Sequence, residues 1–260
     1  MNETLHLLLN RRSIRAYEKR PISAEDHDLL LRATLRAPTA GNMMLYSIIE
    51  VNDQAAKETL ARSCDNQPFI ATAPLVLLFL ADYQRWHDYF RYSGVAELCQ
   101  RRGEPMRVPL EGNLFLACND ALIAAQTAVI AAESLGIGSC YIGDIMENYE
   151  IHRDLFGLPP YVFPICLLCF GYPTRSQLAR AMTPRYDRKF IVFPDRYRRL
   201  EPADFDEMYR DAQARFLKNP DRPAGIKNVG QAMYRRKFSA DFSVEMTRSV
   251  RAILNTWETS

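Results

Sequence analysis

Two runs of apolar residues without polar alternation stand out along the chain, at residues 74–81 and 162–170. A strand with one face in water alternates apolar and polar side chains, whereas an unbroken apolar strand is covered on both faces. Shorter segments at residues 47–51 and 138–143 predict two further strands. The pattern therefore predicts a sheet whose central strands are covered on both faces.

Apolar residues at helical spacing predict helices at residues 2–10, 23–36, 53–63 and 149–156. The most apolar long stretch runs from Leu114 to Leu135 and is apolar on nearly all faces. It contains the polar residues Asn119, Asp120, Gln126, Thr127 and Glu133. These groups would be costly in hydrocarbon, so the stretch predicts a buried helix and not a membrane span. A helix of this kind must be buried all round, which favours a dimer that covers it jointly.

Residues 83–110 fit neither pattern well and are interpreted as an insertion or excursion. After Pro173 the chain becomes basic, proline-rich and aromatic until Leu200, and about two helices complete it. No Pro/Gly/Ser-rich linker divides the sequence. We expect a single domain over residues 1–260, of which about 175–260 form a C-terminal extension.

Composition removes several classes of function. The 33 basic and 31 acidic residues leave a net charge of only +2, which argues against a general binder of nucleic acids or membrane surfaces. The only C-x-x-C pair, Cys166 and Cys169, lies inside an apolar run, so we interpret both as core residues and expect no metal. The N-terminus lacks the features of a signal peptide, and we expect a soluble, cytoplasmic protein.

No nucleophile elbow, paired histidine motif or G-x-G-x-x-G loop is present in the sequence, so a cofactor is expected to supply the chemistry. Arg11, Arg12, Ser13 and Arg15 form a cluster suited to a phosphate group, because guanidinium groups bind phosphate oxygens bidentately. The alternative is a solvated basic turn. A second basic group around Arg185 would reach the same phosphate only if the fold brought it there.

Two further segments have the composition of a ring-binding site. In the loop of residues 38–42, small residues would let a planar ring approach the backbone, and Asn42 together with Gln67 offers donors and acceptors to a polar ring edge. In the segment from Tyr141 to Asp144, a glycine leaves backbone N–H groups accessible. Each signal is weak when taken alone.

Taken in order, these segments resemble the nitroreductase family. The resemblance begins with the arginine cluster and the motifs Pro21-Ile and Ala37-Pro-Thr-Ala-Gly-Asn42, and continues through Gln67. It extends over Asp120-x5-Gln126-x6-Glu133-Ser-Leu-Gly136, Tyr141-Ile-Gly143, Leu158-Pro159 and Leu168-Cys-Phe-Gly-Tyr-Pro173. Pro184-Arg185 and Arg196-Tyr197 are similar to the oxygen-insensitive NADPH nitroreductases and NADPH–flavin reductases. The match covers roughly residues 8–200.

The resemblance implies an α+β fold with a mixed, largely antiparallel sheet flanked by helices, in an intertwined homodimer with two FMN sites at its interface. By resemblance, the FMN phosphate and ribityl chain would be held by Arg11, Arg12, Ser13 and Arg185. The polar side of the ring would be addressed by Arg15, Asn42 and Gln67, with Thr39 beside it. Tyr141 precedes the backbone groups of Ile142, Gly143 and Asp144, which would lie near the reactive N5 atom. No side chain is expected to act as a covalent catalyst.

Three departures from the subgroup pattern matter. Thr183 stands where the subgroup usually has a lysine, and Asp144 stands where a second glycine is common. The Asp144 carboxylate would lower the flavin potential if it faced the ring, or would be an ordinary loop acid if it pointed away. The basic residues that would select NADPH lie in the poorly matched C-terminal part, where Lys218, Arg222 and Lys227 are candidates. The choice between NADH and NADPH therefore stays open.

The sequence thus predicts an FMN-dependent oxidoreductase that transfers electrons from NAD(P)H to small molecules by a ping-pong mechanism. Nitroaromatics, quinones and free flavins are the expected acceptors. Two alternatives are a dedicated flavin reductase for a partner oxygenase and a flavin-binding protein with little turnover.

Overall fold

The computed structural model describes residues 1–259, which form two compact units. The first unit comprises Met1–Arg180 with residues 245–259, and the second comprises Ala181–Val244. The expectation of one domain over the whole chain stays a prediction. The last part of the expected C-terminal extension belongs to the first unit, together with the residues that precede the extension.

The first unit contains the helices α1 (Glu3–Asn10), α2 (Ala24–Thr34), α3 (Gln54–Ser63), α4 (Phe69–Thr72), α5 (Gln84–Tyr92), α6 (Val95–Arg102), α7 (Glu111–Ser134), α8 (Tyr149–Phe156) and α9 (Arg175–Leu178). Its strands are β1 (Tyr46–Glu50), β2 (Leu75–Asp82), β3 (Gly138–Ile142) and β4 (Val162–Gly171), and its 3-10 helices are η1 (Ala40–Asn42) and η2 (Gly143–Met146). The second unit contains η3 (Arg188–Phe190), α10 (Pro202–Lys218), α11 (Val229–Met233) and the π-helical turn η4 (Tyr234–Phe238). Helix α12 (Asp241–Thr259) begins in the second unit and ends in the first.

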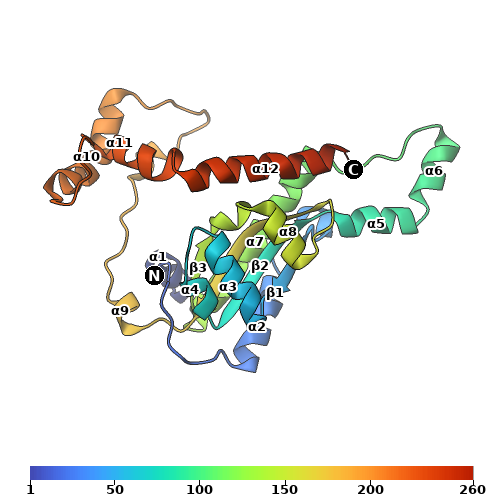
Figure 1. The fold of residues 1–260 in the computed structure, drawn as a ribbon, viewed down its shortest axis with the longest axis horizontal. Coiled ribbons are helices and arrows are strands. Elements are labelled where there is room, and N and C mark those ends of the chain that lie inside the picture. The colour runs from blue at the N-terminus through green and yellow to red at the C-terminus, as the bar shows by residue number, and fades with distance from the viewer. Residues whose placement is uncertain (260) are drawn as a thin grey trace. The chain divides into compact units, whose positions relative to one another are not determined.

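The four strands form one sheet, which lies near the centre of Figure 1. Their order is β1-β2-β4-β3, and every neighbouring pair is antiparallel. A parallel bridge between Ser13 and Ser139 adds the N-terminal segment to the free edge of β3. The predicted α+β fold with a largely antiparallel sheet is confirmed, and all four predicted strands are present.

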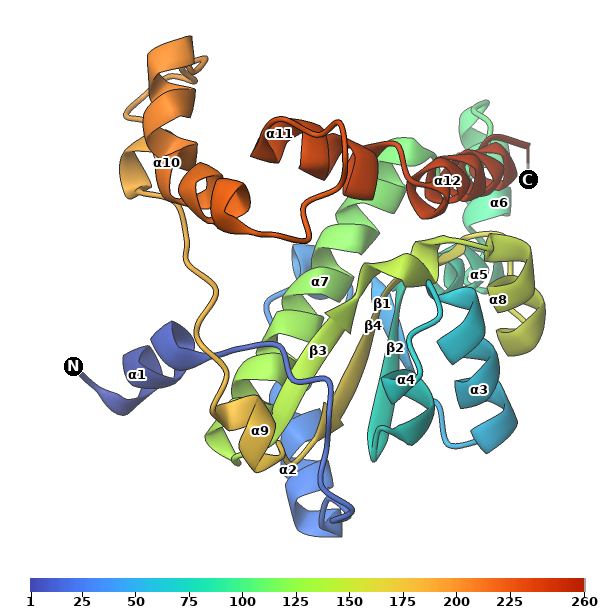
Figure 2. The same cartoon turned by 60° about the vertical axis from the view of Figure 1, so that its left-hand side comes forward.

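The unbroken apolar runs of β2 and β4 have the expected cause. Leu77 and Phe79 pack into a cluster with α2 and α7 on one face of the sheet. Leu78 and Leu80 point to the other face, where they join the cluster formed with α3 and α4. Figure 2 shows the sheet lying between α7 on one side and α3 with α4 on the other. Each central strand is therefore buried on both faces, as its sequence predicts.

Helix α7 covers one face of the sheet with small residues. Six alanines, each at 0% exposure, lie on its sheet-facing side: Ala117, Ala121, Ala124, Ala125, Ala128 and Ala132. By length and composition alone α7 could span a membrane, but half of its most apolar window is buried inside the protein. Its other face carries exposed apolar side chains, including Phe115 at 68% and Ile123 at 41%. One copy of the chain therefore leaves an apolar part of the helix exposed.

The region that the sequence left unplaced contains α5 and α6, which extend away from the sheet in Figure 1. Helix α5 is nevertheless attached to the segment before β1, because Trp86 Nε1 donates to the carbonyl of Met43 at 2.7 Å. The Arg85 guanidinium also binds the carbonyls of Met44 and Tyr46.

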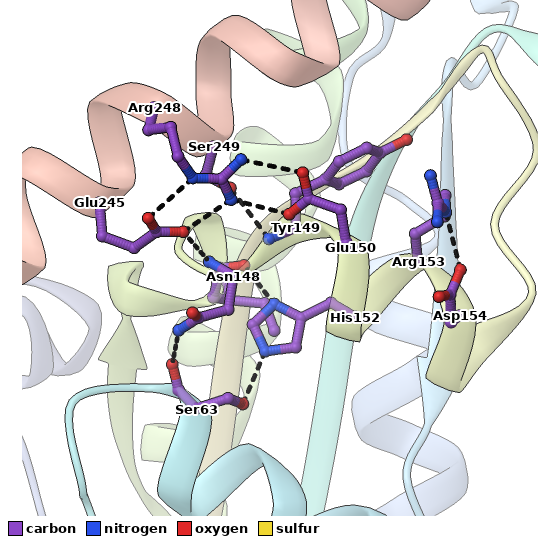
Figure 3. Close-up of polar contacts among 11 residues, drawn as sticks. Ser63, Asn148, Tyr149, Glu150, His152, Arg153, Asp154, Glu245, Arg248 and Ser249 are labelled. Atoms are coloured by element: carbon purple, nitrogen blue, oxygen red, sulfur yellow. Dashed lines mark hydrogen bonds and ion pairs between the residues drawn. The ribbon is translucent and has the colours of Figure 1, made fainter.

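The C-terminal part of α12 closes one end of the first unit. Ile253 and Trp257 are fully buried there. Arg248 binds the Glu150 carboxylate with two hydrogen bonds of 2.9 and 2.7 Å, so α12 is joined to α8 (Figure 3). The Ser249 hydroxyl accepts a hydrogen bond from the Tyr149 backbone at 3.0 Å. These contacts hold the start of α8, and with it the turn that follows β3.

Candidate functional site

The arginine cluster lies along the free edge of β3. The Ile14 N–H donates to the Ser139 carbonyl at 2.9 Å, and the Ile14 side chain is 2% exposed. Because side chains alternate along an extended segment, the neighbours of Ile14, Ser13 and Arg15, face away from the core. Gly138 makes this approach possible, since a Cβ atom at that position would collide with the Ile14 side chain.

Arg11 and Arg12 have different surroundings. Arg12 Nη1 donates to the carbonyls of Leu178 and Arg180, both at 2.7 Å, so it binds the segment after α9. Arg11 Nη1 is buried and has no hydrogen-bond partner among residues 1–259. Burial raises the pKa of Glu133, and the charges of Arg11 and Arg12 oppose that rise. Arg11 is therefore held near the half-buried carboxyl of Glu133 but keeps an unsatisfied donor.

Ser13 and Arg15 meet at the thiol of Cys140 on β3. Both side chains lie within hydrogen-bonding reach of this thiol, whose pKa is raised by burial and lowered less strongly by Arg15 and Arg11. The Arg15 backbone N–H donates to Gln177 Oε1 at 3.2 Å. The β3 edge thus collects three of the four predicted phosphate-side residues around one strand.

Gln67 joins the same wall at the end of β3. Its Nε2 atom donates to the Cys64 carbonyl at 3.0 Å and to Asp144 Oδ2 at 2.7 Å. Both partners are acceptors, so the nitrogen faces them and the amide oxygen remains available to a ligand donor. The Asp144 carboxylate therefore binds Gln67, and its effect on the flavin potential stays a prediction.

The end of β3 is open where the ring was predicted to lie. Ile142 is buried at 1% exposure, whereas Gly143 is exposed and has no atom within 4 Å of the position its Cβ would take. The Tyr141 hydroxyl donates to Gln126 on α7 at 3.3 Å. At this end of the strand, the buried Ile142 side chain fixes the backbone, and the backbone of Gly143 is accessible.

The loop with Thr39 and Asn42 lies elsewhere in the protomer. It leads into β1, the strand at the opposite edge of the sheet from β3. Asp120 of α7 holds the loop by accepting from the backbone N–H groups of Ala40 and Leu45 at 3.0 and 3.1 Å. The Thr39 hydroxyl accepts from the Met44 N–H at 3.1 Å. Three strand spacings of about 4.8 Å separate the two edges, so the structure does not bring this loop to the arginine cluster within one chain.

Asn42 also lines a cavity of about 680 Å³ beside β1. The other walls of this cavity include Met43, Tyr46, Arg85 and Trp86. Its position beside η1 and α5 makes the loop accessible from outside the protomer.

Arg185 belongs to the second unit, where it is exposed and donates to the Thr183 carbonyl at 3.3 Å. It lines a depression of about 520 Å³ together with Arg210 and Arg215. Its assignment to the phosphate stays a prediction.

The roles of two residues near the site could not be predicted from the sequence. Asp120 matched the family pattern, but its two backbone hydrogen bonds connect positions about 80 residues apart. Glu147 is 4% exposed behind Asp144, and its only sequence signal is the spacing of three residues between two acids. Within the described residues, no group of three potential metal ligands is arranged around a common point.

The β3 edge fits FMN. The buried, unsatisfied Arg11 Nη1 atom is a donor suited to a phosphate oxygen, which accepts charge-assisted hydrogen bonds. The Gln67 oxygen is an acceptor suited to a ring N–H, and the open backbone at Gly143 leaves room for a flat group. These three features occur along one strand and the turn after it.

Comparison with known proteins identifies the family of the chain. The model of the nitroreductase family matches residues 8–172. An FMN reductase (NADPH) of Bacillus subtilis is 32% identical over 187 residues, which cover 71% of this chain and 72% of that protein. An oxygen-insensitive NADPH nitroreductase of Salmonella typhimurium is 29% identical over 210 residues, or 80% and 81% of the two chains. The structure of NfrA2 from B. megaterium superposes with a TM-score of 0.76 at 28% identity, covering 99% of this chain and 98% of the other. The predicted family is confirmed, and the chain belongs to the nitroreductase family.

Proposed function

We propose that this chain, an FMN-dependent NAD(P)H oxidoreductase, transfers electrons to nitroaromatics, quinones or free flavins by a ping-pong cycle. The observation that carries the proposal is the β3 edge, where the unpaired Nη1 atom of Arg11 lies beside the strand and the Gln67 amide lies at the turn that follows it. Bound FMN supplies the centre that accepts and donates hydride. The protein binds and orients the reactants there, so no covalent catalyst is required.

The residues of the β3 edge bind different parts of FMN. Arg11 binds the phosphate through its unsatisfied donor, and Ser13 adds a hydroxyl beside it. Arg15 faces the polar side of the ring, where its fixed charge favours accumulation of negative charge. Arg12 is partly occupied by the carbonyls of Leu178 and Arg180, so its contribution is to hold the surrounding backbone.

A homodimer completes the site. The outer face of α7 exposes four large apolar side chains in one protomer: Phe115, Leu116, Leu122 and Ile123. A second copy that covers this stripe in a two-fold dimer removes it from water on both sides at once. The loop with Thr39 and Asn42 is then supplied to each FMN site by the partner subunit, because it lies far from the arginine cluster of its own chain.

We further infer that the protein works in the cytoplasm. Its six cysteines are all free, and four of them are buried. Thiols of this kind persist in reducing compartments.

Steady-state kinetics test the proposed function. We expect the purified protein to carry FMN and to oxidise NADPH or NADH with a nitroaromatic, a quinone and free FMN as separate acceptors. Parallel initial-rate lines on varying both substrates support the ping-pong cycle, and intersecting lines contradict it. Turnover with free FMN alone points to a dedicated flavin reductase. Bound flavin without turnover of any acceptor points to a flavin-binding protein.

A further inference from the structure

A buried acidic side chain lies directly behind the Gln67–Asp144 pair. Glu147 is 4% exposed, and its Oε1 atom has no hydrogen-bond partner among the described residues. The Glu147 N–H donates to the Asp144 carbonyl at 3.0 Å, which closes the 3-10 turn η2. Residues three apart in such a turn lie on the same side of it. The carboxyl groups of Asp144 and Glu147 therefore face each other, within hydrogen-bonding reach.

The groups that face Glu147 are mostly acidic. Its own turn contributes Asp144, the connection between α3 and α4 contributes Asp65, and α12 contributes Glu245. The Cys64 thiol also lies near Asp144 and Glu147, and burial raises its pKa, so it stays neutral.

Among the described residues of α8 and α12, no cation compensates Glu147. His152 of α8 is fully buried between the Ser63 hydroxyl and the Ile145 carbonyl, and burial lowers the pKa of its ring (Figure 3). Arg248 of α12 is occupied by Glu150 and Glu245.

Two carboxyl groups in contact form a hydrogen bond only when one of them carries a proton. Burial, and then the negative charges of Asp144, Asp65 and Glu245, raise the pKa of Glu147 to about 8. Glu147 is therefore neutral at pH 7 and donates its proton in a hydrogen bond to Asp144.

We propose that Glu147 is a positioning residue of the FMN site, which in its neutral form donates to Asp144 and so directs the Gln67 amide oxygen toward the cofactor. The inference rests on the proposed FMN site. Asp144 is held from one side by Glu147 and binds the Gln67 nitrogen on the other, at 2.7 Å. The second hydrogen of that nitrogen is bound by the Cys64 carbonyl at 3.0 Å, so the amide has one orientation. Ionised Glu147 repels Asp144 and releases this arrangement.

The dissociation constant of FMN as a function of pH tests this role. Titrations of the apoprotein, followed by flavin fluorescence, run from about pH 6 to about pH 9.5 and span the pKa of about 8. If FMN binds only the neutral form, the constant rises about tenfold per pH unit above that pKa. Glu147→Gln keeps a donor of the same shape and cannot ionise, so its dissociation constant should match that of the wild type at pH 7 and stay flat.

Two other variants separate positioning from general alkaline damage. Asp154→Asn on the exposed side of α8 removes an acid whose ion pair, among the described residues, is with Arg153, and it should keep the wild-type slope. Asp144→Asn removes the charge that ionised Glu147 would repel, so the rise in the dissociation constant should begin at a higher pH than in the wild type. A slope that is unchanged in Glu147→Gln overturns the proposal.

The Asp144→Asn result depends on two effects of opposite sign. Loss of the Asp144 charge lowers the pKa of Glu147, so Glu147 ionises at a lower pH than in the wild type. The ionised carboxylate then meets a neutral amide that can donate to it, and no repulsion releases Gln67. In this variant FMN affinity is therefore retained above the pH at which Glu147 ionises. A rise that begins at a lower pH than in the wild type contradicts the positioning role, because the charge of Glu147 alone would then weaken binding.

The thermal stability of the apoprotein gives a readout without FMN. The pKa of Glu147 is about 8 in the folded state, above the value of 4.5 expected for an exposed glutamate. Between these two values the folded chain keeps the Glu147 proton, whereas the unfolded chain loses it. The stability that this proton contributes is therefore lost as the pH rises toward and through about 8. The unfolding temperature of Glu147→Gln should fall less than that of the wild type over this range, and equal losses contradict the assignment.

The outcomes separate the two proposals. A wild-type protein that binds no FMN at pH 7 overturns the proposed function. A wild-type protein that binds FMN with a constant that does not change with pH overturns the role of Glu147 alone.

Discussion

Arg11 and Arg15 carry the same charge on the same edge strand, but their neighbours give them different roles. Arg11 keeps a buried donor without a partner, which suits a phosphate that is charged in both redox states of FMN. Arg15 lies at the thiol of Cys140 on β3. Cys140 comes shortly before Ile142, Gly143 and Asp144, where the ring is expected to lie. A fixed cation beside the ring stabilises the negative charge that reduction adds.

Arg15→Gln should therefore lower the midpoint potential of bound FMN. A hydrogen bond to a charged group contributes about 1.5–3 kcal/mol, which corresponds to about 30–60 mV for a two-electron couple. Spectroelectrochemical titration at saturating FMN measures the potential. Arg11→Gln is the matched control, and it should weaken FMN binding with a smaller change in potential. If Arg15→Gln only weakens binding, Arg15 is a phosphate ligand and this assignment is wrong.

At the scale of elements, the site depends on how closely the N-terminal segment approaches β3. Gly138 allows the contact, because any Cβ at this position collides with Ile14. Ile14 is 2% exposed and anchors the segment between Ser13 and Arg15. A glycine in β3 thus controls the position of two residues that the sequence places more than 120 positions away.

Gly138→Ala should displace the segment from β3 and reduce both stability and FMN affinity. Overpacking of this kind costs about 1–3 kcal/mol. In a double-mutant cycle with Ile14→Ala, the combined loss of stability should be smaller than the sum of the single losses, because the smaller side chain relieves the collision. Chemical unfolding at equilibrium measures the stability. Strictly additive losses would show that the two positions do not meet.

Much of the fold could be predicted from the sequence because its signals are local. The unbroken apolar runs of β2 and β4 identify strands covered on both faces, and the Tyr149–Phe156 helix was predicted with its observed bounds. Helices α5 and α6 could not be placed, because α5 is attached through Arg85 and Trp86 to a segment about 40 residues earlier. No local pattern contains that contact.

In the candidate site, too, local features could be predicted from the sequence and tertiary contacts could not. The charge cluster at Arg11 to Arg15 is visible in the sequence, as is the glycine after Ile142. The hydrogen bonds of Asp120 and the burial of Glu147 arise from tertiary contacts, so their residue types alone give no indication of them. Thr39 and Asn42, which the resemblance places beside the ring, lie at the other edge of the sheet in one chain, so their assignment stays a prediction that depends on a second copy.

At the scale of the whole molecule, the proposed FMN site requires two copies of the chain. The outer face of α7 exposes an apolar stripe, and the two groups of candidate FMN residues lie at opposite edges of one sheet. A two-fold dimer explains both observations, since it covers the stripe and brings the Asn42 loop of the partner subunit to each β3 edge. The central claim is therefore that every FMN site is shared between two protomers.

Mixing two defective variants tests this claim most directly. Arg11→Gln damages the β3 edge, and Asn42→Gly damages the loop without straining its positive φ of 56°. Each variant alone should bind FMN weakly at all of its sites. After the subunits have exchanged, random pairing makes about half of the dimers hybrid, and each hybrid has one intact site and one doubly defective site. FMN titration should then recover about a quarter of the sites with wild-type affinity. No recovery in a mixture that sedimentation shows to contain exchanged dimers, or tight FMN binding by a stable monomer, would contradict the account.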